Sequence, residues 1–398
     1  MSGIRGYGVA YAHTHTHART HVRPRTHTQL PATETVLTPQ TRRQTRRLPG
    51  RRPTLDDVAR GSGVSKSTVS RVINGEDKVR AEVVERVREV IDELGYVPNS
   101  AARQLVTRRN NAIAVVASQP QNRLFIDPFF DLHLRGIRKE LVAHGTQPVL
   151  LFLEEPEEYP RVGDFLGGGH VDGALLFSLR ADDPLPGMIE RLGLPAVFGG
   201  RPLVREGERV RECVYVDADN RGGAREAVRH LVSLGREHIA TITGPYDQEA
   251  SAVDRLDGYR DVLLDASPDL VERADYTRQG GADAMAALLD RRPDLDAVFV
   301  ASDLMASGAL QVLRERGRRV PDDVAVVGFD DLAPIAEHTD PPLTTVHQDI
   351  EGMGRLMARL LFSRAGETEA GGVTGAAEAG RPLSSVVTPT KLVVRKSA

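Results

Sequence analysis

The sequence predicts an α/β protein: an N-terminal all-α helix-turn-helix domain followed by two α/β subdomains with parallel sheets. Two observations predict this. Apolar residues recur at helical spacing between Thr54 and Leu94, with glycines between the runs, and from Asn111 onward short apolar runs alternate with amphipathic segments. Strand–helix alternation is typical of parallel sheets covered by helices. About 290 residues is long for one sheet, so two subdomains are expected.

Three helices are expected in the first domain. Thr54 and Asp57 form a capping-box pattern that starts one helix, and Gly61–Gly63 ends it. Ser65 is placed to cap a second helix, which Asn74 and Gly75 end. A third helix is expected from about Ala81 to Leu94, because Gly95 and Pro98 stop it. Two short helices joined by a glycine-containing turn and supported by a third make a helix-turn-helix.

The second part alternates between strands and helices. Expected strands are Ile113–Ser118, Pro148–Leu153, Ala174–Ser178, Ala196–Gly199, Ile239–Thr243, Ala297–Val300, Val324–Gly328, and a closing pair, Ser384–Thr388 and Lys391–Val394. Expected helices are Phe130–His144, Asn220–Leu234, Arg255–Asp265, Gly281–Asp290 and Leu304–Arg316. Residues 365–382, rich in Gly, Ala and Glu, are expected to be a low-complexity surface loop.

Charge is distributed unevenly along the chain. The formal net charge of -3 hides a basic N-terminal part: residues 1–110 hold 20 Lys and Arg against 10 Asp and Glu, and residues 111–398 hold 32 against 45. Such asymmetry favours one module that faces a polyanion. Much of the excess lies in residues 1–52, a basic segment without apolar periodicity that we expect to be disordered. Its alternating His and Thr residues leave a weak metal-binding tract or a basic DNA arm as alternatives.

Cysteine content and hydropathy suggest a compartment. Cys213, the single cysteine, leaves no internal disulfide framework and fits a reducing cytoplasm. No apolar run approaches the ~18–20 residues of a transmembrane helix, and the N-terminus has no apolar signal-peptide core. We therefore expect a cytoplasmic, nucleoid-associated protein without membrane partners.

Several motifs resemble one known family. TLDDVA at 54–59, GVSKSTVSRVIN at 63–74 and LGYVPNSAARQL at 94–105 are similar, almost position for position, to the DNA-binding headpiece of the lactose-repressor (LacI/GalR) family of bacterial transcriptional regulators. DPFF at 127–130, VDG at 171–173, RLDGY at 255–259, VGFDD at 327–331 and PLTTV at 342–346 agree with the remainder of that family. The 50-residue extension and the loop at 365–382 depart from it.

The resemblance implies a domain plan. Residues 1–52 form the basic extension, 53–98 the helix-turn-helix domain, 99–110 a hinge helix and linker, and 111–398 an effector-binding and dimerisation domain. This last domain is expected to consist of two subdomains like those of periplasmic binding proteins. Ligands of such sheets bind at the carboxyl ends of strands, here in the cleft between the subdomains.

The DNA-contacting residues follow from the helix-turn-helix. Its second helix enters the major groove, where Arg71 can present a fork to guanine and where Lys66 and Ser67, by resemblance, also read bases. Thr54, Ser65, Thr68 and Asn74 are expected at phosphates, and Ser70 lies on the same outer face. The alternative, an ordinary solvated face, stays open for Lys66 and Arg71.

The hinge segment is assigned a separate role by the resemblance. Asn99 can cap residues 100–106, which are too short to be helical alone and would fold only on operator DNA. Leu105 would then wedge into the minor groove while Ala102 permits close approach; a core contact is the alternative for Leu105. A ligand that moves the subdomains would melt this helix and release DNA.

The effector residues are transferred by motif match. Expected contacts are Phe129, Phe130, Arg201, Asp219, Arg255, Asp303, Asp330 and Gln348. Aromatic rings and charged planar groups suit a sugar, and the two acidic residues Asp303 and Asp330 disfavour an anion, so a neutral mono- or disaccharide is expected. Three alternatives stay open: Phe130 as core, Asp219 as only a helix cap, and Asp303 as a cap of its own helix.

The function expected from these motifs is a sequence-specific transcriptional regulator, a repressor controlled allosterically by a sugar. Two half-sites of a palindromic operator imply a homodimer at least, and a tetramer stays open. A transporter's binding protein would lack the helix-turn-helix. A sugar-acting enzyme would need two carboxylates flanking one bond, and adjacent Asp330 and Asp331 make a poor pair. No enzyme motif, cofactor or metal site is expected.

Overall fold

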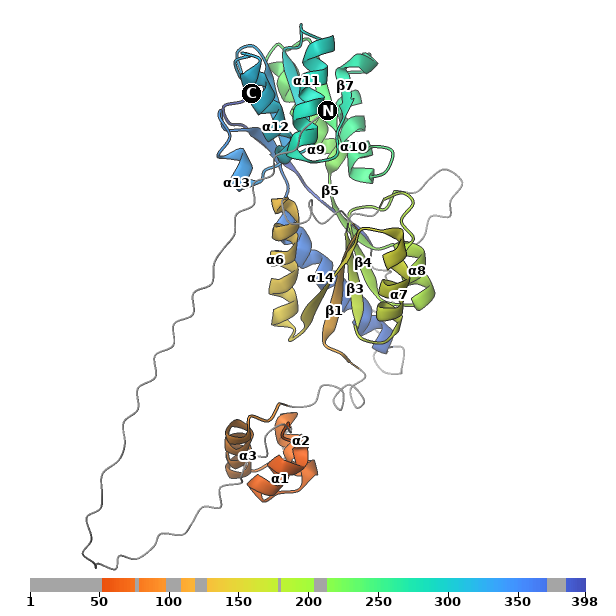
Figure 1. Ribbon diagram of the computed structural model, residues 1–398, viewed down its shortest axis with the longest axis vertical. Coiled ribbons are helices and arrows are strands. Elements are labelled where there is room, and N and C mark those ends of the chain that lie inside the picture. Colours follow the sequence, from red (N-terminus) through yellow and green to blue (C-terminus); the bar gives the residue numbers. More distant parts are fainter. Residues whose placement is uncertain are drawn as a thin grey trace, which may run out of the picture. The chain divides into compact units, whose positions relative to one another are not determined.

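The computed structural model describes residues 52–75, 79–97, 109–118, 127–177, 180–203, 213–370 and 384–398, with side chains from 365 to 370 excepted. These residues form two compact units, one ending at Val97 and the other beginning after it. Figure 1 shows the elements of each unit. In the parts of the chain just given, no helix is long and apolar enough to cross a membrane.

The first unit contains the three expected helices, α1 (Leu55–Ser62), α2 (Lys66–Ile73) and α3 (Ala81–Leu94). The capping box forms, because Asp57 accepts hydrogen bonds from both the amide and the hydroxyl of Thr54, at 2.9 and 2.7 Å. Gly63 and Gly95 end α1 and α3 in the left-handed region, with φ of 67° and 60°. One side chain from each helix, Val58, Val69 and Val87, is fully buried in the small core they share. The predicted helix-turn-helix is confirmed.

The second unit begins with a lobe built on a parallel sheet of order β11-β5-β4-β3-β1-β2. Its strands are β1 (Ala112–Ser118), β2 (Gln147–Leu153), β3 (Gly173–Phe177), β4 (Ala196–Gly199), β5 (Tyr215–Ala218) and β11 (Val386–Thr388). Helices α6 (Pro128–Ala143) and α14 (Ile350–Ala370) cover one face, and α7 (Tyr159–Gly167) and α8 (Leu185–Leu192) cover the other. A short 3-10 turn, Pro156–Glu158, precedes α7.

Helices α6 and α14 pack closely side by side (Figure 1). Gly136 in α6 makes this possible, since a Cβ there would lie 2.0 Å from the carbonyl oxygen of Glu351. Gly354 in α14 meets the backbone of His133 in the same way. The two glycines therefore allow the backbones of α6 and α14 to approach closely.

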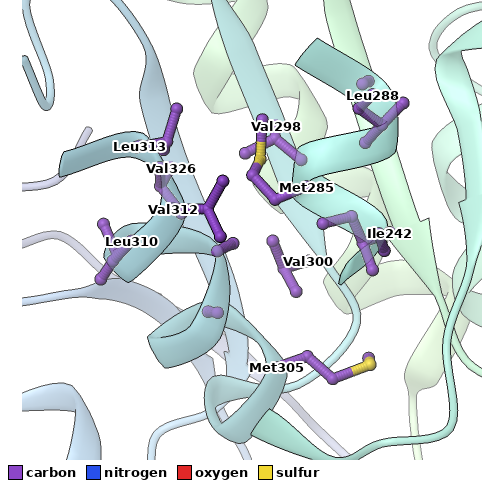
Figure 2. Close-up of a cluster of buried hydrophobic side chains, with 14 of the residues drawn as sticks. Ile242, Met285, Leu288, Val298, Val300, Met305, Leu310, Val312, Leu313 and Val326 are labelled. Atoms are coloured by element: carbon purple, nitrogen blue, oxygen red, sulfur yellow. The ribbon is translucent and has the colours of Figure 1, made fainter. Parts of the chain in front are cut away.

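The second lobe repeats this plan with the order β12-β10-β9-β8-β6-β7. Its strands are β6 (Ile239–Thr243), β7 (Val271–Arg273), β8 (Ala297–Val300), β9 (Ala325–Asp330), β10 (Thr344–His347) and β12 (Lys391–Val393). Helices α9 (Asn220–Ser233) and α10 (Ala250–Arg260) cover one face, and α11 (Arg278–Arg291) and α12 (Asp303–Glu315) the other, with the short α13 (Ala333–Ala336) and a 3-10 turn, Pro268–Leu270. Figure 2 shows the core between α11, α12 and the sheet, where Met285, Val298 and Leu313 are fully buried.

The chain passes between the lobes after β5, after β10 and again between β11 and β12. The closing strands therefore join different sheets: β11 runs parallel to β5, and β12 runs antiparallel to β10. Neither lobe is a continuous stretch of sequence, and the crossing segments connect the two lobes.

The two α/β lobes and most of the expected elements are confirmed, with some corrections. Helix α10 begins at Ala250, ahead of the expected Arg255, and β5, β7, β10, α7, α8, α13 and α14 were not predicted. The expected loop at 365–382 is wrong at its start, because α14 continues to Ala370; residues 371–383 lie outside the described residues. Alanine and glutamate are strong helix formers, which explains how that segment extends a helix.

Candidate DNA-binding surface and effector cavity

Helix α2 separates a buried face from a polar face. Val69 and Val72 are buried against α1 and α3, while Lys66, Ser67, Arg71 and Asn74 are exposed and Ser70 is half-buried. The ammonium of Lys66 lies 2.5 Å from the carboxylate of Asp56 in α1, with both side chains about half exposed or more. A surface pair of this kind contributes little and exchanges readily for a phosphate or a base. Lys66, Ser67 and Arg71, which are predicted to read bases, therefore lie on the exposed face of α2.

Hydroxyl groups gather where α1 and α2 begin. The Ser65 hydroxyl accepts the amide of Thr68 at 3.2 Å and lies 2.9 Å from the Thr68 hydroxyl. The Thr54 hydroxyl is held by Asp57 at the start of α1. Backbone amides at helix N-termini favour phosphate groups, so Thr54, Ser65 and Thr68 stand where phosphate contacts are predicted. The predicted hinge contacts Asn99, Ala102 and Leu105 lie outside the described residues.

A cavity opens between the two lobes of the second unit. Its empty volume is about 870 Å³, open solvent included, which suits a small ligand. The lining comes from both lobes, near the carboxyl ends of β3, β4, β5, β7, β8, β9 and β10 and from α6, α9, α10 and α14: Asp127, Phe129, Phe130, His133, Phe177, Gly199, Gly200, Arg201, Asp217, Asn220, Glu249, Ala250, Ser251, Arg255, Tyr276, Ser302, Asp330, Gln348 and Met353. Six of the eight predicted effector residues are among them.

Arg255 is a buried charged group of this cavity that several neighbours hold in place. It is 5% exposed, and its guanidinium carbon lies 3.7 Å from the centre of the Phe329 ring. Its Nε donates to the side-chain oxygen of Asn220 at 2.9 Å, and Nη1 donates to the carbonyl of Ala301. These contacts fix the plane of the guanidinium before any ligand arrives, which lowers the entropic cost of binding.

Asp330 lies beside Arg255 in the cavity wall. Its Oδ1 accepts the side-chain amide of Gln348 at 2.7 Å and lies 3.4 Å from Nη1 of Arg255. The backbone φ of 109° places Asp330 in a region that non-glycine residues rarely adopt, a feature common at functional sites. Burial raises the pKa of Asp330 to about 7, and the nearby Arg255 limits that rise.

Aromatic rings form one wall. Phe129 is half-buried, Phe130 and His133 are buried, and Phe177 at the end of β3 meets both Phe130 and His133 edge-on. Burial lowers the pKa of His133 to about 4, so its imidazole is neutral at pH 7. This wall offers an apolar ring face beside the Arg255–Asp330 clamp, the combination that recognises a sugar.

Comparison with known proteins identifies the family. Residues 54–99 match the family described as "Bacterial regulatory proteins, lacI family", and residues 228–398 match "Periplasmic binding protein-like domain". The HTH-type transcriptional regulator CelR of Thermobifida fusca is 50% identical over 351 residues, covering 87% of this chain and 98% of CelR. The chain belongs to the lacI family of bacterial regulatory proteins. It is a DNA-binding transcriptional regulator and not an enzyme.

Two solved structures resemble this lacI-family regulator over most of its length. A CelR–cellobiose complex superposes with a TM-score of 0.66 and 46% identity, covering 87% of this chain and all (100%) of the other. The lac repressor dimer bound to operator and the anti-inducer ONPF superposes with a TM-score of 0.73 and 29% identity, covering 87% and 99%.

Two predicted effector residues do not line the cavity of this regulator. Asp219 caps α9, since its Oδ1 accepts the amide of Gly222 at 2.8 Å. Asp303 is fully buried behind the cavity: its oxygens accept the Leu332 amide at 2.7 Å and the Thr345 hydroxyl at 2.5 Å. Burial and the neighbouring Asp330 raise the pKa of Asp303 well above its usual range. The expected direct contacts are therefore corrected: Asp219 is a helix cap, and Asp303 is a buried acceptor for the Leu332 amide and the Thr345 hydroxyl.

Several lining residues of the regulator escaped sequence analysis, among them Asp217, Asn220, Glu249, Tyr276 and Ser302. Asn220 carried a detectable signal, because it follows a strand and starts a helix at a crossing between lobes. Tyr276 and Glu249 lie in connecting segments whose course the sequence pattern does not define. Arg201 is placed at the cavity as expected, but its Nη2 also bonds both carboxylate oxygens of Asp254 in α10, at 2.7 and 2.8 Å.

Proposed function

We propose that this regulator is an operator-binding repressor whose DNA affinity is lowered by a neutral disaccharide of the cellobiose class. The observation that carries the proposal is the fixed Arg255–Asp330 clamp beside an aromatic wall, in a cavity between lobes. A relative with 46% identity is solved as a complex with cellobiose, which supports the same ligand class here. The regulator is expected to act in the cytoplasm, where operator DNA is accessible.

The charge of the cavity supports a neutral ligand. Asp127, Asp217, Glu249 and Asp330 contribute acidic groups, while the lining arginines are Arg201 and Arg255. Arg201 is paired with Asp254 and Arg255 with Asp330, so neither presents an uncompensated positive charge to an anion. A sugar hydroxyl, by contrast, can donate to a carboxylate and accept from a guanidinium at the same time.

The DNA-binding site and the sugar-binding site are coupled through the chain segments that cross between the lobes. Asn220 begins the crossing into the second lobe and holds Arg255, whereas Gln348 begins the return and holds Asp330. A sugar that engages the clamp therefore biases the angle between the lobes. We propose that this change is passed to the hinge at 99–110, and that two copies of the chain, as a homodimer, read a palindromic operator through Arg71 and Lys66.

The proposal is tested by operator release. A fluorescent palindromic site from the regulator's own control region is titrated with the protein and followed by anisotropy, with cellobiose, maltose, ribose or glucose 6-phosphate added. Cellobiose is expected to weaken operator binding by about tenfold or more, a coupling of about 1.4 kcal/mol. Release by glucose 6-phosphate but by no neutral sugar would overturn the assignment of the ligand.

A further inference from the structure

A second cavity opens between the lobes and is not used by the proposed disaccharide site. It lies over the other half of the two sheets, at the carboxyl ends of β1 and β2 in the first lobe and of β6 and β7 in the second. The strand orders place those strands at one end of each sheet, whereas most of the first cavity's lining follows β3, β4, β5, β8, β9 and β10, with Tyr276 after β7. The two cavities are thus neighbouring parts of one cleft.

One residue joins the cavities directly. Glu249, which precedes α10, lines both of them. Beside it, the Ala181 amide of the first lobe donates to the Gln248 carbonyl of the second at 2.9 Å, so the lobes meet at this point. Because Glu249 borders both cavities, a linear ligand longer than the first cavity would extend towards the second.

The lining of the second cavity suits a saccharide. Tyr159 presents a half-buried ring, and its hydroxyl is fixed by Ser118 at 2.9 Å and by Asp183 at 3.3 Å. Pro160, Pro184 and Pro245 add small apolar faces from both lobes. An aromatic ring with polar groups around it is the usual platform for the apolar face of a sugar.

The charges of the second cavity exclude anions. Acidic side chains outnumber the lining arginines, Arg180 and Arg273, and these have their own partners: Arg180 lies 3.7 Å from Asp182, and Arg273 pairs with Asp247 at 2.7 Å. Burial also raises the pKa of Asp183, whose Oδ1 accepts the Leu185 amide at 2.9 Å. A neutral, hydroxyl-rich ligand satisfies such groups without a charge penalty.

We propose that this second cavity is a saccharide compartment that binds the additional glucose units of longer cello-oligosaccharides. The inference rests on the proposed function, since the disaccharide cavity must hold the first two units. The regulator would then sense the length of the oligosaccharide, because its preference for longer saccharides depends on residues outside the Arg255–Asp330 clamp.

Calorimetry on the full-length regulator with cellobiose, cellotriose and cellotetraose tests the inference. Cellotriose is expected to bind about tenfold tighter than cellobiose. Tyr159→Ala is expected to bring cellotriose to within about twofold of cellobiose and to leave cellobiose affinity unchanged, because the platform lies outside the first cavity. Tyr246→Ala, a 41% exposed tyrosine that lines neither cavity, is the matched control and keeps the preference.

A second variant keeps the test decisive if Tyr159→Ala is poorly folded. Ala287 is an exposed residue of α11 on the rim of the second cavity, and Ala287→Trp fills that space without disturbing the core. Equal affinity for all three sugars in the wild type, while cellobiose still releases operator, would refute the compartment and leave the proposed function intact. A length preference that survives both variants would refute its location. If no cello-oligosaccharide binds or releases DNA, the proposed function itself fails.

Discussion

Replacing Arg255 with alanine should separate sugar sensing from DNA binding. The guanidinium is 5% exposed and is fixed by Asn220, Ala301 and the Phe329 ring, with Asp330 at 3.4 Å. A hydrogen bond to a charged group contributes about 1.5–3 kcal/mol, so loss of a paired donor fork should weaken sugar binding by about 3 kcal/mol, or about 100-fold in Kd. Operator affinity without sugar should change by less than about threefold.

The Arg255→Ala substitution should also lower the stability of the folded protein. Removing one partner of a buried ion pair commonly costs about 3–5 kcal/mol. The cost here is reduced, because the pKa of Asp330 is already raised to about 7 and rises further without Arg255, which lets the carboxyl take up a proton. Arg255→Lys keeps the positive charge but loses the planar fork, so it should fold normally and still bind sugar weakly.

Calorimetry with cellobiose, anisotropy with operator and thermal unfolding are needed on the same preparations. Arg260→Ala, an exposed arginine of the same helix, is the matched control and should behave as wild type. Normal sugar-induced release by a folded Arg255→Ala protein would show that Arg255 does not hold the effector.

Three further predictions concern DNA and pH. Arg71→Ala on the exposed face of α2 should cost about 1–3 kcal/mol at one base pair and relax preference there, measured over a set of operator variants; unchanged discrimination would refute its base-reading role. Leu105→Ala should lower specific affinity with little change in nonspecific affinity, measured on operator and random DNA, and equal losses on both would count against the wedge. Since the pKa of Asp330 is raised to about 7, the folded state holds a proton that the unfolded state has lost, so this group's contribution to stability is largest at acidic pH and falls as pH rises towards 7. In urea unfolding, the difference in unfolding free energy between wild type and Asp330→Asn should therefore fall by up to about 1.4 kcal/mol per pH unit between about pH 5 and 7; a difference that does not change with pH would contradict the raised pKa of this buried carboxyl.

Local pattern was sufficient for elements whose boundaries are set by nearby residues. Thr54, Ser65 and Gly95 predicted the helix ends of the first unit because capping depends on the residues beside it. Strands such as Ala196–Gly199 were found because they are short, wholly apolar runs. Helix α14 was not predicted although Met353, Met357 and Leu361 recur at helical spacing and are buried; what the local pattern does not show is its partner α6, more than two hundred residues away in sequence.

The sequence predicted effector-cavity residues correctly only where a motif residue also has its side chain directed into the cavity. Arg255 and Asp330 come from motifs and meet in space, whereas Asp303, also predicted to bind the effector, turns inward to accept from the Leu332 amide and the Thr345 hydroxyl. Sequence shows that Asp303 starts a helix but not which way its carboxylate points. Tyr276 lines the cavity from the segment between β7 and α11, and no local pattern shows that this segment turns towards the cavity.

The central claim, that sugar and operator are coupled through one protein, is tested most directly by measuring cellobiose affinity with and without saturating operator DNA. Linkage requires that the sugar bind more weakly to the operator complex by the same factor by which it weakens operator binding, expected to be about tenfold or more. Equal cellobiose affinity in the free and operator-bound protein would contradict the account.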